Sequence, residues 1–510
     1  MRITNAMMVN QFLNGMYESL NRVNKYQNQV NTTKRITNIS EDPQATVTAL
    51  RARNKLSGLK IYQDNINTAK SYLKEAEAAA KNINSILQTT YEKVIEATGI
   101  GKNEEDLSII ADELKTLQQE LVSIGNTTIG TTYLFGGFNF TGTKDNTGAV
   151  KPPFNVDPAT GHLIYNNIDL TQIACFDDYN ANADSMAKFA DDIKQCIIEI
   201  ADVSSHEYAR DTICAKALNA VRGIIYSANA ALKGTERFGL DTGASDGYKK
   251  LYDFVSSLSE LSDQLSDEIS LRLAGDYILD TDPSIKRTET GEIDYEYYKE
   301  RHISVLTEEE LNNRFNLDDA KAILASIGEL LDNSDATVGL DYSMDDAVNE
   351  LRGEMESILT ATNALTNLDI EADNKCAIQI GKNNSVDFMF TGLDLLGSGK
   401  DNLYYILDKC ISMLKSNDVS GLSKYISEIQ DAQSSILSFQ TVIGPSINRM
   451  DLITTRYDSS DYNYLEMLSN AIDADMAQSI MQLTTALTVY NSALAAGAEI
   501  VQTSLLDFLN

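Results

Sequence analysis

The sequence predicts a mainly α-helical fold: an elongated rod of long antiparallel coiled-coil helices formed by both chain ends, with a small β-rich part and a helical insertion in the middle. Near both ends of the 510-residue chain, apolar residues recur at spacings of three and four, the pattern of a helix seam. Only six prolines interrupt the chain, so long helices can be sustained. Between the ends, "GTTYLFGGFNFTG" is rich in glycine, threonine and aromatic residues, which is typical of β-hairpins.

Changes in this pattern divide the chain into seven expected segments. They are a terminal assembly helix (1–42), a long-helix rod domain (43–130), a β-rich outer region (131–180), a helical insertion or outer domain (181–370), a β-hairpin region (371–400), the return helices of the rod domain (401–460) and a C-terminal assembly helix (461–510).

The first seam predicts the N-terminal assembly helix. Gln27 is its one polar position, and a helix of about 29 residues that carries it would be about 43 Å long at about 1.5 Å per residue. Its apolar residues, which we expect to form an assembly interface, are Val9, Leu13, Met16, Leu20, Val23 and Val30.

A second seam predicts one long helix. Between Pro43 and Thr98 no further proline occurs and Gly58 is the only glycine, so a helix of about 80 Å is expected. Its seam positions are Ile66, Ala69, Leu73, Ala76, Ala80, Ile83, Leu87, Thr90 and Val94. A third seam, from Leu107 to Ile124, is expected to fold back on this helix after a glycine-containing turn.

The middle of the chain changes character twice. After the β-rich region, helical periodicity returns in shorter pieces between about 185 and 370, interrupted by a polar, acidic stretch that we expect to be an exposed connection. The segment "CAIQIGKNNSVDFMF" then alternates like a pair of strands around a Lys-Asn-Asn turn.

The C-terminal seam mirrors the N-terminal one. Its positions fall at alternating spacings of four and three, with Gly497 as the small member. The residues expected at the assembly interface are Met476, Ile480, Leu483, Leu487, Tyr490, Leu494 and Val501.

Opposite charges accompany the two terminal seams. Residues 1–40 carry five basic side chains against Glu18, whereas residues 461–510 carry six acidic side chains and no basic one. Such helices should pair with each other or with equivalent helices of neighbouring subunits; the alternative is two solvated faces of unrelated helices. Because neither stripe has a complete partner in a single chain, we expect both terminal helices to be disordered in the monomer and to order on assembly.

A cluster of charges separates the first two helices. Lys34 and Arg35 are expected in the last turn of the first helix, where cations suit the negative end of its dipole. Asp42 is a good N-cap for a helix whose first position is Pro43. We interpret these four residues as helix caps at a joint between the two helices. The alternative is a small ligand site made of four charged side chains.

Enzymatic and nucleic-acid-binding functions find no support in the composition. The formal net charge of −32 argues against a nucleic-acid partner, and neither a cleaved signal nor a membrane span is readable. The five cysteines lack paired spacing, so reduced and mostly buried thiols are expected. We therefore predict no catalytic, cofactor-binding or metal site. The three histidines are far apart, at His162, His206 and His302.

One segment has a superficial likeness to a phosphate-binding loop. In "GLDLLGSGKD", Asp394 stands where the first glycine of such a loop belongs, and Asp401 follows Lys400 in place of serine or threonine. A turn after a strand is the better interpretation.

Several motifs together resemble the bacterial flagellin family of axial proteins. They are "MRIT", "QNQVNTTKRITNISEDPQA", "GTTYLFGG", "VIGPSINRMD" and the final "SNAIDADMAQSIMQLTTALTVYNSALAAGAEIVQTSLLDFLN". The resemblance covers roughly the first 155 and last 135 residues. Thr33 departs from it, because the family commonly has glycine there. The helical stretch between 185 and 370 departs too, because the resemblance implies a mainly β outer domain.

Within the family, the sequence is most similar to the subunits at the junction of hook and filament. The features that favour these subunits are the Pro of "SEDP", the motif "NRMD", Tyr490 and the final "SLLDFL". The resemblance implies a structural protein, exported without a cleaved signal peptide through the flagellar type III apparatus, that self-associates in a ring. Its implied partners are the first hook-associated protein, flagellin and an export chaperone, with no membrane insertion. Two alternatives remain: a flagellin filament subunit and a cytoplasmic coiled-coil scaffold or signalling protein.

Overall fold

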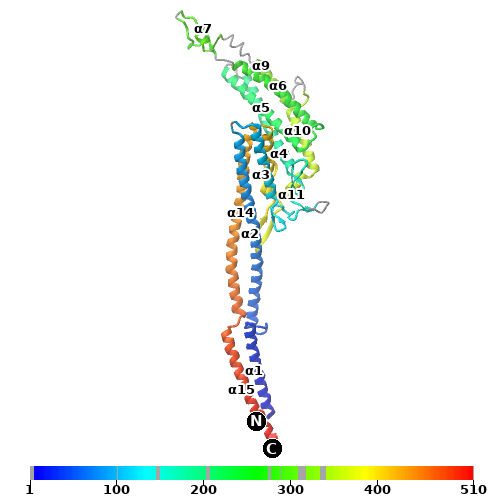
Figure 1. The fold of residues 1–510 in the computed structure, drawn as a ribbon, viewed down its shortest axis with the longest axis vertical. Helices are drawn as coiled ribbons and strands as arrows, with labels where there is room; N and C mark the ends of the chain where they lie inside the picture. The colour runs from blue at the N-terminus through cyan, green and yellow to red at the C-terminus, as the bar shows by residue number, and fades with distance from the viewer. Residues whose placement is uncertain are drawn as a thin grey trace. The chain divides into compact units, whose positions relative to one another are not determined.

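The computed structural model describes residues 5–99, 101–144, 150–202, 207–273, 277–288, 290–301, 303–307, 318–332 and 340–508. These are mainly α-helical with small sheets, as predicted. The chain divides into two compact units (Figure 1). Unit 1 contains Met1–Lys74, Ala377–Phe388 and Val442–Asn510; unit 2 contains Glu75–Cys376 and Met389–Thr441.

Unit 1 is built by both chain ends. Helix α1 (Asn5–Thr32) packs along α15 (Met476–Phe508). The first part of α2 (Pro43–Ala97) runs antiparallel to the end of α14 (Val419–Ile472). In that pair, Gln63 donates a 2.9 Å hydrogen bond to Asp458, and Lys70 forms an ion pair with Asp451.

A hairpin packs on this helix pair within unit 1. It consists of β10 (Cys376–Gly381) and β11 (Asn384–Met389), which confirms the predicted strand pair. The Tyr457 hydroxyl donates to the carbonyl of Ile380 at 2.6 Å, and the Asn65 amide donates to the carbonyl of Gln379 at 2.7 Å.

The prediction for α2 is confirmed in length and in register. The helix spans 55 residues, and all nine predicted seam positions from Ile66 to Val94 are fully buried. The third seam forms α3 (Glu104–Gly125), which begins at an Asn103 capping box. Within unit 2, Lys93 of α2 reaches Glu113 of α3 at 2.6 Å, so the two helices contact each other as expected.

The rest of unit 2 consists of the helical insertion and several small sheets. Helix α4 packs on α5, α5 on α6, and α6 on α9 and α10, while α3 packs on α13. These helices have the following bounds: α4 (Leu170–Asp202), α5 (Glu207–Phe238), α6 (Asp246–Leu273), α7 (Tyr295–Lys299), α9 (Asp318–Asp332), α10 (Met344–Ala361), α11 (Ala364–Ala372), α12 (Gly392–Leu396) and α13 (Leu403–Lys415). A short 3-10 helix, Gly399–Asp401, precedes α13. The segment that was predicted as a turn after a strand therefore contains α12 and this 3-10 helix.

The strands of unit 2 form antiparallel pairs and one parallel pair. The main sheet has the order β5-β6-β7, with Phe154 opposite Tyr165 and Tyr165 opposite Ile168. The parallel pair, β8 with β9, lies where an exposed connection was predicted. The strands are β1 (Thr128–Ile129), β2 (Thr132–Tyr133), β3 (Thr143–Lys144), β4 (Val150–Lys151), β5 (Phe154–Val156), β6 (Leu163–Tyr165), β7 (Ile168–Asp169), β8 (Tyr277–Leu279) and β9 (Ser304–Leu306).

Two predicted boundaries are wrong. The β-rich region, predicted as 131–180, ends at Asp169, because the Asp169 side chain accepts a 2.8 Å bond from the N–H of Gln172 and so starts α4. The C-terminal assembly helix, predicted as 461–510, begins at Met476, because α14 continues to Ile472.

The cysteines follow the sequence-based expectation, whereas His162, which was expected at the surface or in a turn, does not. Four of the five cysteines are buried, and Cys376 is half-buried. His162 is buried against Asp169, with 2.7 Å between Nδ1 and Oδ2. His206 and His302 lie outside the described residues.

Candidate assembly interface

The contact between α1 and α15 uses small residues on the C-terminal helix. Ser479 and Ala486 are buried there, and the ring of Phe12 lies against Gly497. A Cβ at Gly497 would stand 2.3 Å from the ring carbon Cζ of Phe12, which is closer than van der Waals contact allows. Glycine therefore permits the close approach of the two helices at this level.

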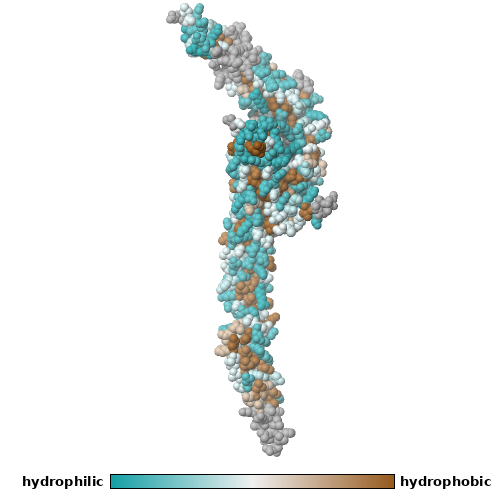
Figure 2. Space-filling model, in the orientation of Figure 1, coloured by the Kyte–Doolittle hydropathy of each residue, from teal (hydrophilic) through white to brown (hydrophobic). Residues whose placement is uncertain are grey.

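Large apolar side chains of α15 lie outside that contact. Ile480, Leu487 and Leu494 are 50%, 40% and 43% exposed, and they recur every seven residues, so they share one helix face. Met481 and Val489, on other sides of α15, are also exposed, by 63% and 51%. Figure 2 shows apolar surface gathered over α1 and α15.

The polar groups between these side chains are satisfied inside the helix. The hydroxyls of Thr484, Thr485, Thr488 and Ser492 each donate to the carbonyl four residues earlier, at 2.8–2.9 Å. In addition, residues 476–498 contain no charged side chain. Burying this face against another protein would therefore leave few polar groups without partners.

The predicted interface residues fall into three groups by exposure. Val23 is buried between the helices. The half-buried ones are Val9, Leu13, Met16, Leu20, Val30, Met476, Leu483 and Tyr490. Ile480, Leu487 and Leu494 are exposed, and the side chain of Val501 lies outside the described residues.

No described helix is long and apolar enough to cross a membrane.

The joint between α1 and α2 differs from the prediction. Helix α1 ends at Thr32, because Thr33 adopts φ +57°, so Lys34 and Arg35 lie beyond the helix rather than in its last turn. Thr33 holds the left-handed conformation that commonly ends helices and that favours glycine. The position at which the sequence departs from the family that it resembles is therefore the one that terminates the helix.

Lys34 and Arg35 instead bind the break between α14 and α15. Lys34 Nζ lies 2.6 Å from Asp473 Oδ1, and the two residues also form an antiparallel backbone bridge. The Arg35 guanidinium donates to the carbonyl of Ala471 at 2.8 Å, and the backbone N–H of Arg35 donates to the carbonyl of Ile472 at 2.7 Å. The break between α1 and α2 is thus bonded directly to the break between α14 and α15.

The remaining joint residues start the flanking helices. The Asp42 carboxylate accepts a 3.0 Å bond from the N–H of Ala45, with Pro43 as the first residue of α2. Asp475 caps α15 in the same way, through a 3.1 Å bond from the N–H of Gln478. The Glu41 carboxylate accepts a 2.9 Å bond from the N–H of Thr37.

Two joint carboxylates are stabilised in their charged form. The hydrogen bond from Lys34 lowers the pKa of Asp473, and the backbone N–H of Thr37 lowers the pKa of Glu41. A lowered folded-state pKa contributes stability above the ordinary carboxyl pKa of about 4, and this contribution is lost as the pH falls through the folded value. The joint should therefore be tightest at neutral pH and loosen in acid.

The Lys34–Asp473 pair gives a charge-reversal prediction. Lys34→Glu should speed amide hydrogen exchange at Ala474, whose N–H bonds to the carbonyl of Thr33 at 3.0 Å, because two carboxylates would then repel each other. The double variant Lys34→Glu/Asp473→Lys should restore slow exchange. Because both side chains are about 40% exposed, global stability should change by at most about 1 kcal/mol. Equal exchange in the single and double variants would contradict this role.

The small contact face of α15 was missed by the sequence analysis. Ser479 and Ala486 lie on the α1 side, whereas the seam of large apolar residues was expected to make that contact. Gly497 lies on the same side and had been predicted as the small member of that seam. The alternation of small and large residues at heptad positions was the available signal.

One family model matches the N-terminal part of the chain. Residues 3–139 match the bacterial flagellin N-terminal helical region. Flagellar hook-associated protein 3 of Escherichia coli (strain K12) is 27% identical over 143 residues, which are 27% of this chain and 44% of that protein. The protein of the same name from Salmonella typhimurium (strain LT2) is 27% identical over 139 residues, again 27% and 44% of the two chains. The chain thus matches less than half the length of these relatives.

A solved structure described as a candidate flagellar hook-associated protein from Vibrio parahaemolyticus aligns with 85% of this chain and 100% of that one, at 10% identity and a TM-score of 0.40. The family match over residues 3–139 and the two matches to hook-associated protein 3 confirm the predicted resemblance to the flagellin family.

Proposed function

We propose that this protein is a structural subunit of the bacterial flagellum that joins the hook to the filament by assembling into a ring through its terminal helices. The main support is the uncharged α15 face, where Ile480, Leu487 and Leu494 are exposed although a matching apolar surface would bury them. The N-terminal match to flagellar proteins supports a flagellar role and points to a structural protein rather than an enzyme.

The proposed mechanism follows from the same face. In the ring, the large apolar residues of α15 would pack against helices of neighbouring subunits, and each 100 Å² of apolar surface removed from water would contribute about 2.5 kcal/mol. An export chaperone would bind the subunit in the cytoplasm, and type III export would then carry it to the growing tip of the flagellum. It would then bind the first hook-associated protein on one side and flagellin on the other.

Deletion of the gene in its native bacterium tests this function. We expect complete hooks without attached filaments, with flagellin released into the medium, because the filament would lack its base. Electron microscopy of the cells and immunoblotting of the medium measure both effects. Re-expression of the intact gene should restore filaments, and filaments that persist in the deletion strain would refute the proposal.

Two other functions give different results. A flagellin subunit would extend filament seeds into long self-filaments, whereas the proposed junction subunit would not. A cytoplasmic scaffold would be absent from purified flagella and from the medium. The exposed apolar face and the N-terminal match favour the junction role over the scaffold.

A further inference from the structure

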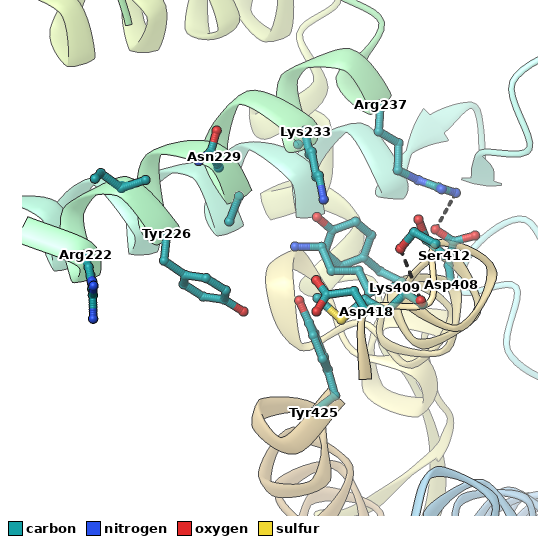
Figure 3. A pocket seen from close by; sticks show the side chains of 16 residues that line it. Arg222, Tyr226, Asn229, Lys233, Arg237, Asp408, Lys409, Ser412, Asp418 and Tyr425 are labelled. Atoms are coloured by element: carbon teal, nitrogen blue, oxygen red, sulfur yellow. Dashed lines mark hydrogen bonds and ion pairs between the residues drawn. The ribbon is translucent and has the colours of Figure 1, made fainter. Parts of the chain in front are cut away.

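A pocket in unit 2 lies between α5, α13 and the start of α14 (Figure 3). Its volume is about 370 Å³, which is within the range of small-molecule sites. It lies apart from the terminal helices, and the proposed assembly role does not use it.

One face of α5 lines this pocket with polar and basic side chains. Its residues recur at spacings of three and four, which places them on a single side of the helix. They are Arg222, Tyr226, Asn229, Lys233 and Arg237. With Lys409 of α13, the lining holds four cations against the carboxylates of Asp408 and Asp418. This is the reverse of the chain as a whole, which has 42 basic and 74 acidic residues.

Two of these cations are neutralised by neighbours and two are not. Arg237 pairs with Asp408 at 2.5 Å, and Lys409 pairs with Asp178. Arg222 donates to the neutral hydroxyl of Ser266 at 3.2 Å, and among the described residues Lys233 forms no ion pair. Positive charge is therefore available to a ligand, and the Lys233 side chain extends from α5 toward the pocket in Figure 3.

A tyrosine hydroxyl opens onto the pocket. Tyr425 is only 4% exposed, and its hydroxyl, which points into the pocket in Figure 3, makes no hydrogen bond to the described residues. Burial raises the pKa of Tyr425, so the group remains a neutral donor at physiological pH. An acceptor oxygen of a ligand in the pocket would receive a hydrogen bond from it.

We infer that this pocket binds a small organic anion, a flat ring that carries a phosphate or carboxylate group. Lys233 pairs with the anionic group, and the Tyr425 hydroxyl donates a hydrogen bond to one of its oxygens. The ring packs against Tyr226 and the apolar side chains of Ile225 and Met413, which also line the pocket. Arg222, farther along α5, adds positive potential that attracts the anion.

Binding of phenyl phosphate to the full-length protein tests this inference. We expect saturable binding with a Kd of about 1 mM. Isothermal titration calorimetry and saturation-transfer NMR of the phenyl protons measure this binding. Lys233→Glu should weaken binding at least about tenfold, and Tyr425→Phe about threefold, since one charged and one neutral contact are lost. Orthophosphate alone and benzyl alcohol alone should each bind more weakly than phenyl phosphate, because each lacks half of the contacts.

Lys216→Glu is the matched control, because it makes the same charge change on an exposed residue of the same helix outside the pocket. It should bind as the unchanged protein does, and circular dichroism should show all variants folded. The inference is overturned by absence of binding at about 10 mM, or by equal losses in the Lys233 and Lys216 variants. Unchanged affinity in Tyr425→Phe, or orthophosphate binding as tightly as phenyl phosphate, would also overturn it.

Discussion

Replacing Leu487 and Leu494 of α15 together by glutamate is expected to leave the isolated protein folded and to abolish filament attachment in the native bacterium. Both side chains are at least 40% exposed in the single chain, so the substitutions remove little internal packing. At an assembled interface, however, each buried and unpaired carboxylate would cost several kcal/mol. The loss should therefore appear in assembly and not in the fold.

The measurement combines circular dichroism of the purified variant with counts of filamented cells in a strain that carries only the variant gene. Ile198→Glu is the matched control, because Ile198 is 63% exposed and lies on α4 in unit 2. We expect the control to retain filaments. If the double variant assembles normally, the α15 face is not the subunit interface.

The long helices could be predicted because one pattern acts along their whole length. Every seam position of α2 from Ile66 to Val94 is buried, and no proline or glycine cluster competes with that pattern. For such an element, local propensity and tertiary packing favour the same structure, so little further information is needed.

The joint was predicted in place but not in its contacts. The capping position of Asp42 follows from its neighbours in sequence, whereas the binding of Lys34 to Asp473 joins residues 439 apart. Single-sequence patterns carry no information about such pairs. The end of α1 depends on a positive φ at Thr33, a conformation that threonine rarely adopts, so propensity alone placed Lys34 and Arg35 inside the helix.

The pocket of unit 2 could be predicted only in part. The periodic stripe from Arg222 to Arg237 is visible in the sequence, yet such stripes are usually solvated faces. Its opposite wall comes from α13 and Tyr425, nearly 200 residues further on. Only tertiary structure shows that these surfaces face each other.

Replacing Tyr165 by alanine is expected to cost about 3–5 kcal/mol in the free energy of unfolding of unit 2. Tyr165 is fully buried in β6, and its ring centroid lies 4.7 Å from that of Phe154. A Cβ on Gly392 would stand 2.2 Å from Phe154 and 2.6 Å from Tyr165, so the two rings fill the space that this glycine leaves open. Removal of the Tyr165 ring would create a cavity that the surrounding backbone cannot close.

The hydroxyl of Tyr165 adds a second contribution that can be separated from the first. It donates to the carbonyl of Phe135 at 3.0 Å and accepts from the N–H of Gly392 at 3.0 Å. Tyr165→Phe keeps the ring but leaves both backbone groups buried without a partner, so it should cost about 1–3 kcal/mol. Urea unfolding monitored through hydrogen exchange of the β5-β6-β7 amides measures the loss of stability in both variants within the same unit.

Tyr295→Ala is the control for both variants, because Tyr295 is 61% exposed at the start of α7 and its removal should change stability by less than about 0.5 kcal/mol. A loss for Tyr165→Ala that is no larger than for Tyr165→Phe would mean that the surrounding side chains refill the ring's space. A Tyr165→Phe variant as stable as the unchanged protein would mean that water reaches the two backbone groups. In the expected order, alanine is the most destabilising and phenylalanine intermediate, because packing and hydrogen bonding both hold the strands and α12 against the loop at Phe135.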